Sequence, residues 1–150
     1  TVTGLSASCT GLTNGTSYTF SVTATNANGT GSASSSSSSI TATTVPQAPT
    51  IGTATAGNGQ ASVTFTGNGN GGASITSYTV TSSPGGFTAS GSSSPLTVTG
   101  LTSSTSYTFT ITATNGIGTS TASPSSDPIT ATTVPQAPTI GSFSRTGSGM

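Results

Sequence analysis

Side chains that could support acid–base, metal or nucleophilic chemistry are almost absent from this sequence. Arg145 is the only basic residue, Asp127 the only carboxylate and Cys9 the only thiol, and there is no histidine. General acid–base catalysis needs two titratable groups, a serine nucleophile needs a base, and zinc or calcium needs several ligands. The sequence therefore predicts a protein that is not an enzyme and that holds no cofactor or metal.

The same inventory argues against nucleic acid and membranes as partners. One arginine cannot neutralise a run of phosphates, and no stretch approaches the roughly 18 apolar residues of a membrane-spanning helix. The glycine-rich run 67–72 could be mistaken for a phosphate-binding loop, but it lacks lysine and no helical pattern follows it. We interpret it as a turn, and we expect neither nucleic-acid binding nor membrane insertion.

Hydroxyl side chains dominate the composition, since Ser and Thr occupy 66 of the 150 positions. A polar chain without charge could be disordered, because it buries little apolar surface to offset the entropy of ordering. Here, however, the apolar residues alternate with threonine in short runs bounded by Gly, Asn, Pro and Ser, which is typical of half-buried strands. We therefore expect ordered β-structure, with the serine tract 34–39 as the segment most prone to disorder.

A long internal repeat organises the chain. Residues 11–52 align with residues 100–141 without a gap, and 31 of these 42 positions are identical, which gives a period of 89 residues. A period of this length indicates tandem β-domains rather than the coils of a solenoid. We expect residues 1–45 to be the C-terminal half of one repeat, 46–134 a complete repeat, and 135–150 the first strand of the next.

The complete repeat contains seven predicted strands and no helical periodicity, which indicates two packed antiparallel sheets. We expect the strands at residues 48–51, 61–66, 75–81, 87–89, 96–99, 107–113 and 129–134. Their inward positions predict a core of Val63, Phe65, Ile75, Tyr78, Val80, Leu96, Val98, Leu101, Tyr107, Phe109 and Ile111. The prolines at the start of the first strand are typical of an exposed edge.

These runs resemble the fibronectin type III domain, in the form found in tandem arrays on bacterial surface proteins. The resemblance rests on residues 72–80 (GASITSYTV), 96–101 (LTVTGL), 107–115 (YTFTITATN) and 134–138 (VPQAP). It implies an all-β fold of tandem seven-stranded antiparallel sandwiches. It also implies tyrosine corners at Tyr107 and Tyr18, in which the hydroxyl bonds to backbone upstream and Leu101 or Leu12 lies beneath. Phe65 occupies the position where the family usually has tryptophan.

Two kinds of side chain leave alternatives open. Cys9 aligns with Val98 at an inward position, so we favour a small buried residue over an intermolecular disulfide. Asn14-Gly15-Thr16 and Asn28-Gly29-Thr30 match the glycosylation sequon, but Asn-Gly is also the commonest turn pair. We therefore favour turns at Asn14 and Asn28 over attached glycans.

With chemistry excluded, a mechanical function is favoured. We expect a structural repeat of an extracellular filament, sheath, stalk or surface layer, outside or on the surface of a bacterial cell. Linkers at 45–49 and 134–138 would be stiff because Pro46 and Pro135 fix φ, and other copies of the chain are the expected partners. The alternative is a spacer or adhesive module of a secreted carbohydrate-active protein or surface adhesin. Only Phe87 and Phe143 are candidate sugar-binding aromatics for that function.

Overall fold

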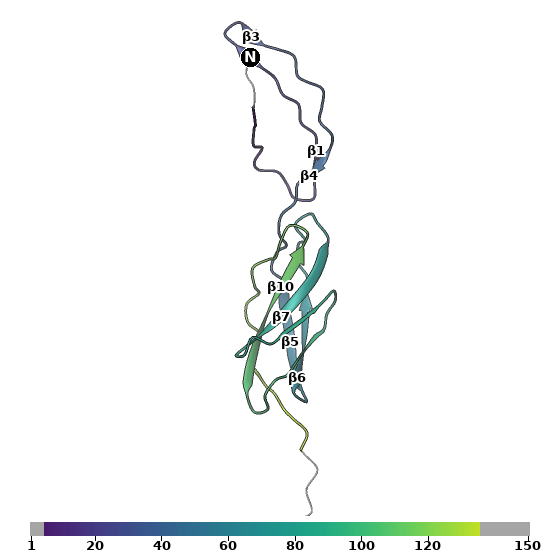
Figure 1. Ribbon diagram of the computed structural model, residues 1–150, viewed down its shortest axis with the longest axis vertical. Coiled ribbons are helices and arrows are strands. Elements are labelled where there is room, and N and C mark those ends of the chain that lie inside the picture. The colour runs from purple at the N-terminus through teal and green to yellow at the C-terminus, as the bar shows by residue number, and fades with distance from the viewer. Residues whose placement is uncertain (1–4, 136–150) are drawn as a thin grey trace, which may run out of the picture.

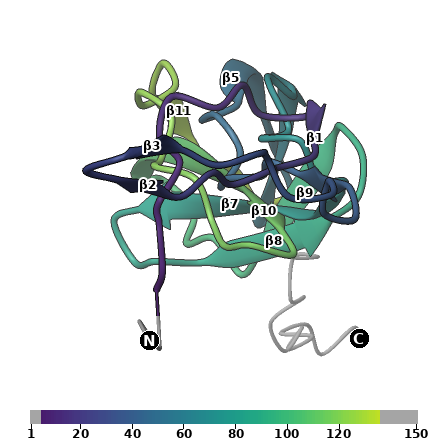
Figure 2. The same cartoon turned by 90° about the horizontal axis from the view of Figure 1, so that it is seen from above.

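Strands form where threonine and small apolar residues alternate, because β-branched side chains suit a pleated surface. The computed structural model describes residues 5–135, and these contain strands and no helix. The described chain forms a smaller N-terminal unit and a larger C-terminal sandwich, which follow one another along the long axis (Figure 1). Viewed down that axis, the first unit overlies the sandwich (Figure 2).

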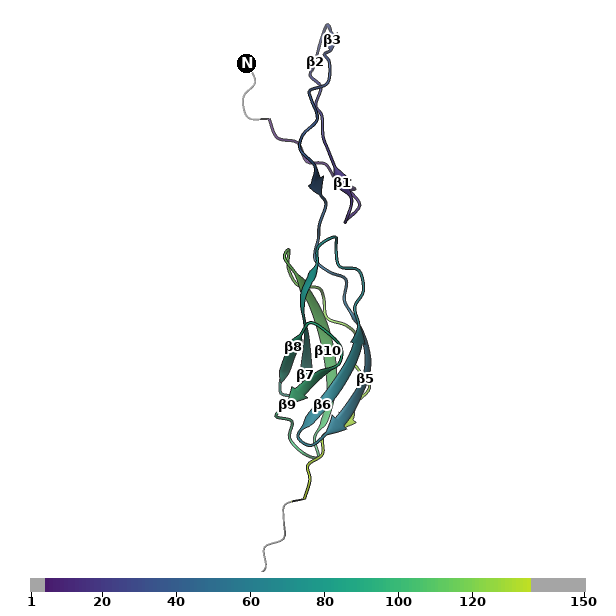
Figure 3. The ribbon, with the colours of Figure 1, turned by 90° about the vertical axis from the view of Figure 1, so that its right-hand side faces the viewer.

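The sandwich consists of two antiparallel sheets that face one another (Figure 3). One sheet has the order β5-β6-β9, and the other has the order β11-β10-β7-β8. The strands are β5 (Thr50–Gly57), β6 (Gln60–Thr66), β7 (Ile75–Ser83), β8 (Thr88–Gly91), β9 (Leu96–Thr99), β10 (Ser106–Asn115) and β11 (Ile129–Thr130). The prediction of an all-β antiparallel sandwich is therefore confirmed.

The core lies between the two sheets, where alternate residues of facing strands point inward. Its fully buried side chains include Val63 of β6, Val80 of β7, and Phe109 and Ile111 of β10. Small residues absent from the predicted core are buried as well, namely Ala61, Ala113 and Ala131. Ile75 and Tyr78, in contrast, are only half-buried. Phe65 packs on Tyr78, with ring centroids 4.8 Å apart at 48°.

The prolines that begin the sandwich differ from expectation. β5 does lie at the edge of its sheet, but it is longer than the predicted strand because it continues to Gly57. Pro46 and Pro49 are buried rather than exposed, and Pro49 is among the most buried residues of the chain. Both prolines are therefore covered by neighbouring chain instead of lying on an exposed edge.

A segment with no strand assignment runs beside β10. Ser120, Ser123 and Ser126 of this segment lie at every third position and are all buried. Their amides donate to carbonyl oxygens of β10 at 2.8–2.9 Å. Their Oγ atoms accept from the amides of the same β10 residues, which are Ala113, Ile111 and Phe109. Three residues of the segment thus span the same length along the sheet as two residues of β10.

The N-terminal unit is smaller, and its strands form two separate two-stranded sheets. Its strands are β1 (Ser17–Tyr18), β2 (Thr25–Asn26), β3 (Gly29–Thr30) and β4 (Ile40–Thr41), and they pair as β1 with β4 and β2 with β3.

The serine tract of this unit is bonded to the chain beside it. Ser34 and Ser37 bond to Val22 and Phe20 through both amide and Oγ, as the serines beside β10 do. The prediction of disorder in tract 34–39 is therefore wrong for these two serines.

Candidate functional site

No catalytic constellation is present in residues 5–135. Within this range, no three His, Cys, Asp or Glu side chains gather where they could hold a metal ion. Nor does this range contain a helix with the length and apolar character needed to span a membrane. The candidate sites are therefore surfaces of contact: the apolar face of the N-terminal unit and the junction between that unit and the sandwich.

Each unit contains a tyrosine whose hydroxyl accepts a hydrogen bond from backbone five residues upstream. The amide of Thr102 donates to the Tyr107 hydroxyl at 3.1 Å, and the amide of Thr13 donates to the Tyr18 hydroxyl at 3.0 Å. This is the geometry of a tyrosine corner. The Thr13 amide bond lowers the pKa of Tyr18 below its ordinary value because a donor stabilises the phenolate.

The leucines that precede the two tyrosines differ in burial. Leu101 is buried in the sandwich core, whereas Leu12 is only half-buried. The same contrast separates aligned residues throughout the two units. Val22 is 68% exposed, but Ile111, which aligns with it, is fully buried. The two segments 11–52 and 100–141 are similar in sequence but differ in burial. Strands β5 and β6 face the second segment, and no described strand faces the first.

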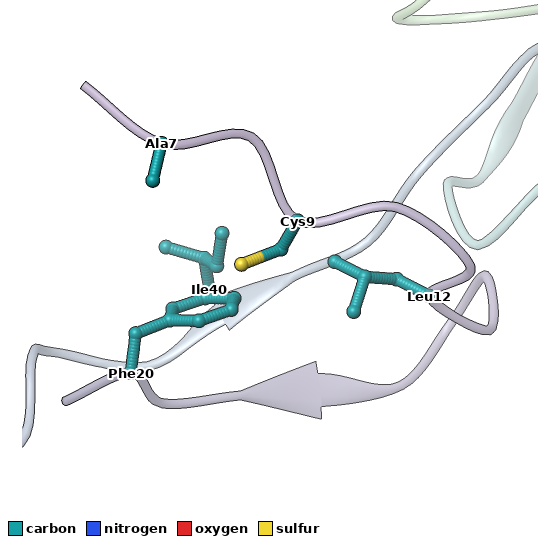
Figure 4. A pocket seen from close by; sticks show the side chains of 5 residues that line it. All are labelled: Ala7, Cys9, Leu12, Phe20 and Ile40. Carbon is teal, nitrogen blue, oxygen red and sulfur yellow. The ribbon is translucent and has the colours of Figure 1, made fainter. Parts of the chain in front are cut away.

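We define the half-core face as six apolar residues of the N-terminal unit that align with core residues of the sandwich or with Ile129, which packs against that core. Its members are Ala7, Cys9, Leu12, Phe20, Val22 and Ile40. Five of them line a hollow of about 230 Å³, and Figure 4 shows Cys9, Phe20 and Ile40 pointing toward one another. Burial of Cys9 was expected, but it is exposed because this face is uncovered. The thiol therefore lies on an open apolar surface.

The junction holds the linker against two loops of the sandwich. The amides of Thr44 and Gln47 donate to the carbonyl oxygens of Gly71 and Gly69, each at 2.8 Å. The Gly69 amide donates in return to the Gln47 side-chain oxygen at 3.3 Å. From the end of β10, where the second loop begins, Asn115 donates through Nδ2 to the Thr44 carbonyl oxygen at 2.8 Å. The run 67–72, interpreted as a turn, is therefore also an interface.

The opposite end of the sandwich holds the departing chain in a similar way. The amide of Gly59 donates to the Thr132 carbonyl oxygen at 2.7 Å, and Asn58 pairs with Thr132 in a parallel bridge. The amide of Val134 donates to the Asn58 side-chain oxygen at 3.3 Å. Pro135, which follows, is exposed. The backbone that enters the sandwich is thus hydrogen-bonded at one end, and the backbone that leaves it is hydrogen-bonded at the opposite end.

The remaining candidate residues lie apart from one another. Asn14 lines the hollow at the junction, together with Gln47 and residues 69–72. Asn28 lies in the exposed turn between β2 and β3. Phe87 is half-buried and packs edge-on against Tyr107, with centroids 6.3 Å apart, which leaves little ring for a sugar. Phe143 and Arg145 lie outside the described residues.

The two facing antiparallel sheets, the seven strands β5 to β11 and the tyrosine corner define an immunoglobulin-like sandwich. Sequence comparison identifies the particular family. The model of the fibronectin type III domain matches residues 45–132, and the chain therefore belongs to the fibronectin type III family. This is a family of non-catalytic domains. No curated protein matches the sequence.

Solved structures similar to this chain contain several domains each. Domains A168–A170 of titin match with 25% identity and a TM-score of 0.52, over 60% of this chain and 33% of that one. The structure of titin kinase and its flanking domains matches with 26% identity and a TM-score of 0.51, over 58% and 17%. The chicken CNTN1 FN1–FN3 domains share the fold at 24% identity and a TM-score of 0.52, over 58% and 33%. This chain thus spans a third or less of these neighbours.

Proposed function

We propose that the chain is a non-enzymatic structural module of a tandem array, located outside the cell or on its surface. One observation carries the proposal: the backbone enters the sandwich beside loop 67–72 and leaves it beside residues 57–59, at the opposite end (Figures 1 and 3). Repeats joined in this way extend the array by one sandwich length each. Fibronectin type III domains commonly serve as such structural or linking modules.

Surface chemistry supports assembly of these arrays side by side into a filament, sheath or surface layer. Asp127 is the only charged residue between positions 5 and 135, so charge neither keeps neighbouring chains apart nor blunts the edges of the sheets. Outward threonines on β7 and β10 offer hydroxyl groups for contact instead. Other copies of the chain are therefore the partners in this proposal, and the contacts between them do not depend on ion pairs.

Electron microscopy of the native full-length protein tests this proposal. Ordered filaments or sheets with an axial spacing of one or two sandwich lengths are the expected result, and they should persist when the salt concentration is raised. Single unassociated strings would contradict the lateral contacts, and assemblies that dissolve in high salt would contradict uncharged contacts.

The second candidate function is that of a spacer between other modules of a secreted or adhesive protein. The multidomain neighbours favour it, because the similar structures contain several domains in one chain. Microscopy distinguishes the two functions, since a spacer appears as a short string that tethers larger particles. The bacterial origin stays a prediction, and the similar structures with a stated source come from chicken and C. elegans.

A further inference from the structure

We propose that Gly69, Asn70, Gly71, Gly72 and Asn115 form a linker socket, which binds the linker of the preceding repeat and fixes the orientation of that repeat. Proline content alone would make a linker extended, but it would leave its direction free. The contacts at the junction specify a direction because they come from two separate loops. The inference concerns the geometry of the tandem arrangement, and it holds for a filament and for a spacer.

Asn115 is the most tightly held residue of the socket. It is 3% exposed, and its amide group uses its full hydrogen-bonding capacity. Nδ2 donates to the carbonyl oxygens of Thr44 and Asn70 at 2.8 and 2.9 Å. Oδ1 accepts from the amides of Ile117 and Gly118 at 2.9 and 3.1 Å. One side chain therefore ties the linker to both loops, and a buried amide loses each of these bonds only at a cost.

Glycine at positions 71 and 72 allows backbone to approach backbone. A methyl group on Gly71 would collide with the Thr44 carbonyl oxygen and lie 2.7 Å from that of Val45. A methyl group on Gly72 would collide with the Gly15 amide and lie 2.8 Å from the Ala42 carbonyl oxygen. The socket thus contacts the body of the N-terminal unit as well as the linker. Such a two-part contact restricts both bending and twisting.

The preceding unit is itself tied to the linker at this point. The amide of Gly15 donates to the carbonyl oxygen of Ala42 at 2.8 Å, and the amide of Ala42 donates to that of Thr16 at 3.1 Å. These bonds attach the start of the linker to turn 13–16, which Gly72 contacts. The amides of Ala42, Thr44 and Gln47 are thus all hydrogen-bonded between the two units.

The sequence repeat predicts the same junction after the sandwich. Residues 133–136 repeat Thr-Val-Pro-Gln of 44–47, and Asn26 aligns with Asn115. Two residues at the junction differ: Asn14, which lines its hollow, aligns with Ser103, and Gly15 aligns with Ser104. A side-chain carbon at Gly15 would lie 3.7 Å from the Gly72 Cα, which is ordinary contact, and Ser104 keeps the positive φ of Gly15 (60° and 79°). We therefore expect a following repeat with the same socket to hold linker 134–138 in the same way, which would make the array stiff.

A pair of glycine substitutions in the 150-residue chain tests the socket. Gly71→Ala blocks the linker, while Gly86→Ala is the matched control because Gly86 also has a positive φ but open space around it. Amide hydrogen exchange by NMR is the measurement. We expect Thr44 and Gln47 to exchange at least about tenfold faster in Gly71→Ala than in the unsubstituted chain and in Gly86→Ala. The Ile111 amide should stay protected in all three chains, which shows that the sandwich is intact.

Asn115→Asp is the second variant, in case Gly71→Ala fails to fold. Aspartate keeps the acceptor for Ile117 and Gly118 but loses both Nδ2 donors, so the amides of the linker should again exchange faster. Residual dipolar couplings add an orientation test: residues 17–41 and β10 should fit one alignment tensor in the unsubstituted chain. Equal exchange at Thr44 in the two glycine variants, or independent tensors in the unsubstituted chain, would overturn the proposal.

Discussion

Ser120, Ser123 and Ser126 each satisfy both backbone groups of one residue on β10. The serine amide donates to the β10 carbonyl oxygen, and Oγ accepts from the β10 amide and donates to the next carbonyl of its own segment. The serine hydroxyl groups therefore accept the hydrogen bonds from β10 amides that backbone carbonyl oxygens accept in a paired strand. The Oγ atoms of these buried serines are thereby satisfied, and no buried side-chain polar atom of the described residues lacks a partner.

Replacing one of these serines should destabilise the sandwich. In Ser123→Ala the amide of the fully buried Ile111 loses its acceptor, and we expect the free energy of unfolding to fall by about 1–3 kcal/mol. Urea unfolding measures the change. Ser125→Ala is the control, because Ser125 is exposed and such surface changes stay within about 0.5 kcal/mol. Equal effects of the two substitutions would contradict the role of Ser123.

Tyr18 should ionise at a lower pH than ordinary tyrosine. Donation from the Thr13 amide lowers its folded pKa below 10.0, so the ionised form favours the folded unit. The resulting stabilisation is present above the unfolded pKa and is lost as the pH falls through the folded pKa. Subtracting the phenolate absorbance titration of Tyr18→Phe from that of the unsubstituted chain isolates this group. A midpoint at or above 10.0 would contradict the assignment.

Among the elements, the paired strands of the N-terminal unit show what the repeated sequence looks like without a facing sheet. Its serines keep their bonds to Phe20 and Val22, because these bonds need only the two adjacent segments that contain residues 20–22 and 34–37. Its apolar side chains stay exposed or half-buried, because full burial needs an opposite sheet. Hydrogen bonding and apolar burial thus contribute separately to the structure of this unit. Only apolar burial depends on strands distant in sequence.

Thiol reactivity should report this difference directly. Cys9 is exposed and should react rapidly with a disulfide reagent, whereas a thiol at the aligned, fully buried Val98 should react only when the sandwich opens. We expect Val98→Cys, made together with Cys9→Ser, to react on the order of 100-fold more slowly. Both chains should react equally fast in urea. Equal rates in native buffer would show that the half-core face is covered.

At the scale of the whole molecule, we expect the half-core face to be complementary to a front half of the same repeat. Residues 1–9 align with 90–98, so a second copy of residues 46–89 placed ahead of Thr1 should complete the sandwich. The expected result is that the reactivity of Cys9 falls toward that of the buried thiol at position 98. A copy carrying Val80→Asp is the control, because a buried charge prevents packing. Unchanged reactivity in the lengthened chain would contradict the complementarity.

The fold class and most strand positions could be predicted because the signal is local. Alternation at Val63 and Phe65, or at Phe109 and Ile111, is visible within a few residues and indicates which face is buried. The segment beside β10 escaped detection, since its serines recur every third residue and not every second. In retrospect the spacing of Ser120, Ser123 and Ser126 is the signal, and Gly31, Ser34 and Ser37 repeat it.

The sequence by itself determined the all-β class, the 89-residue repeat and the absence of catalytic residue sets, because these depend on residue types and spacing. Only the tertiary structure decided which copy of a repeated side chain is buried, since Val22 and Ile111 have equivalent neighbours in sequence and different neighbours in space. The same holds for loop 67–72. Its glycines suit a turn in any context, and they become an interface only because the fold brings Thr44 and Gly15 against them.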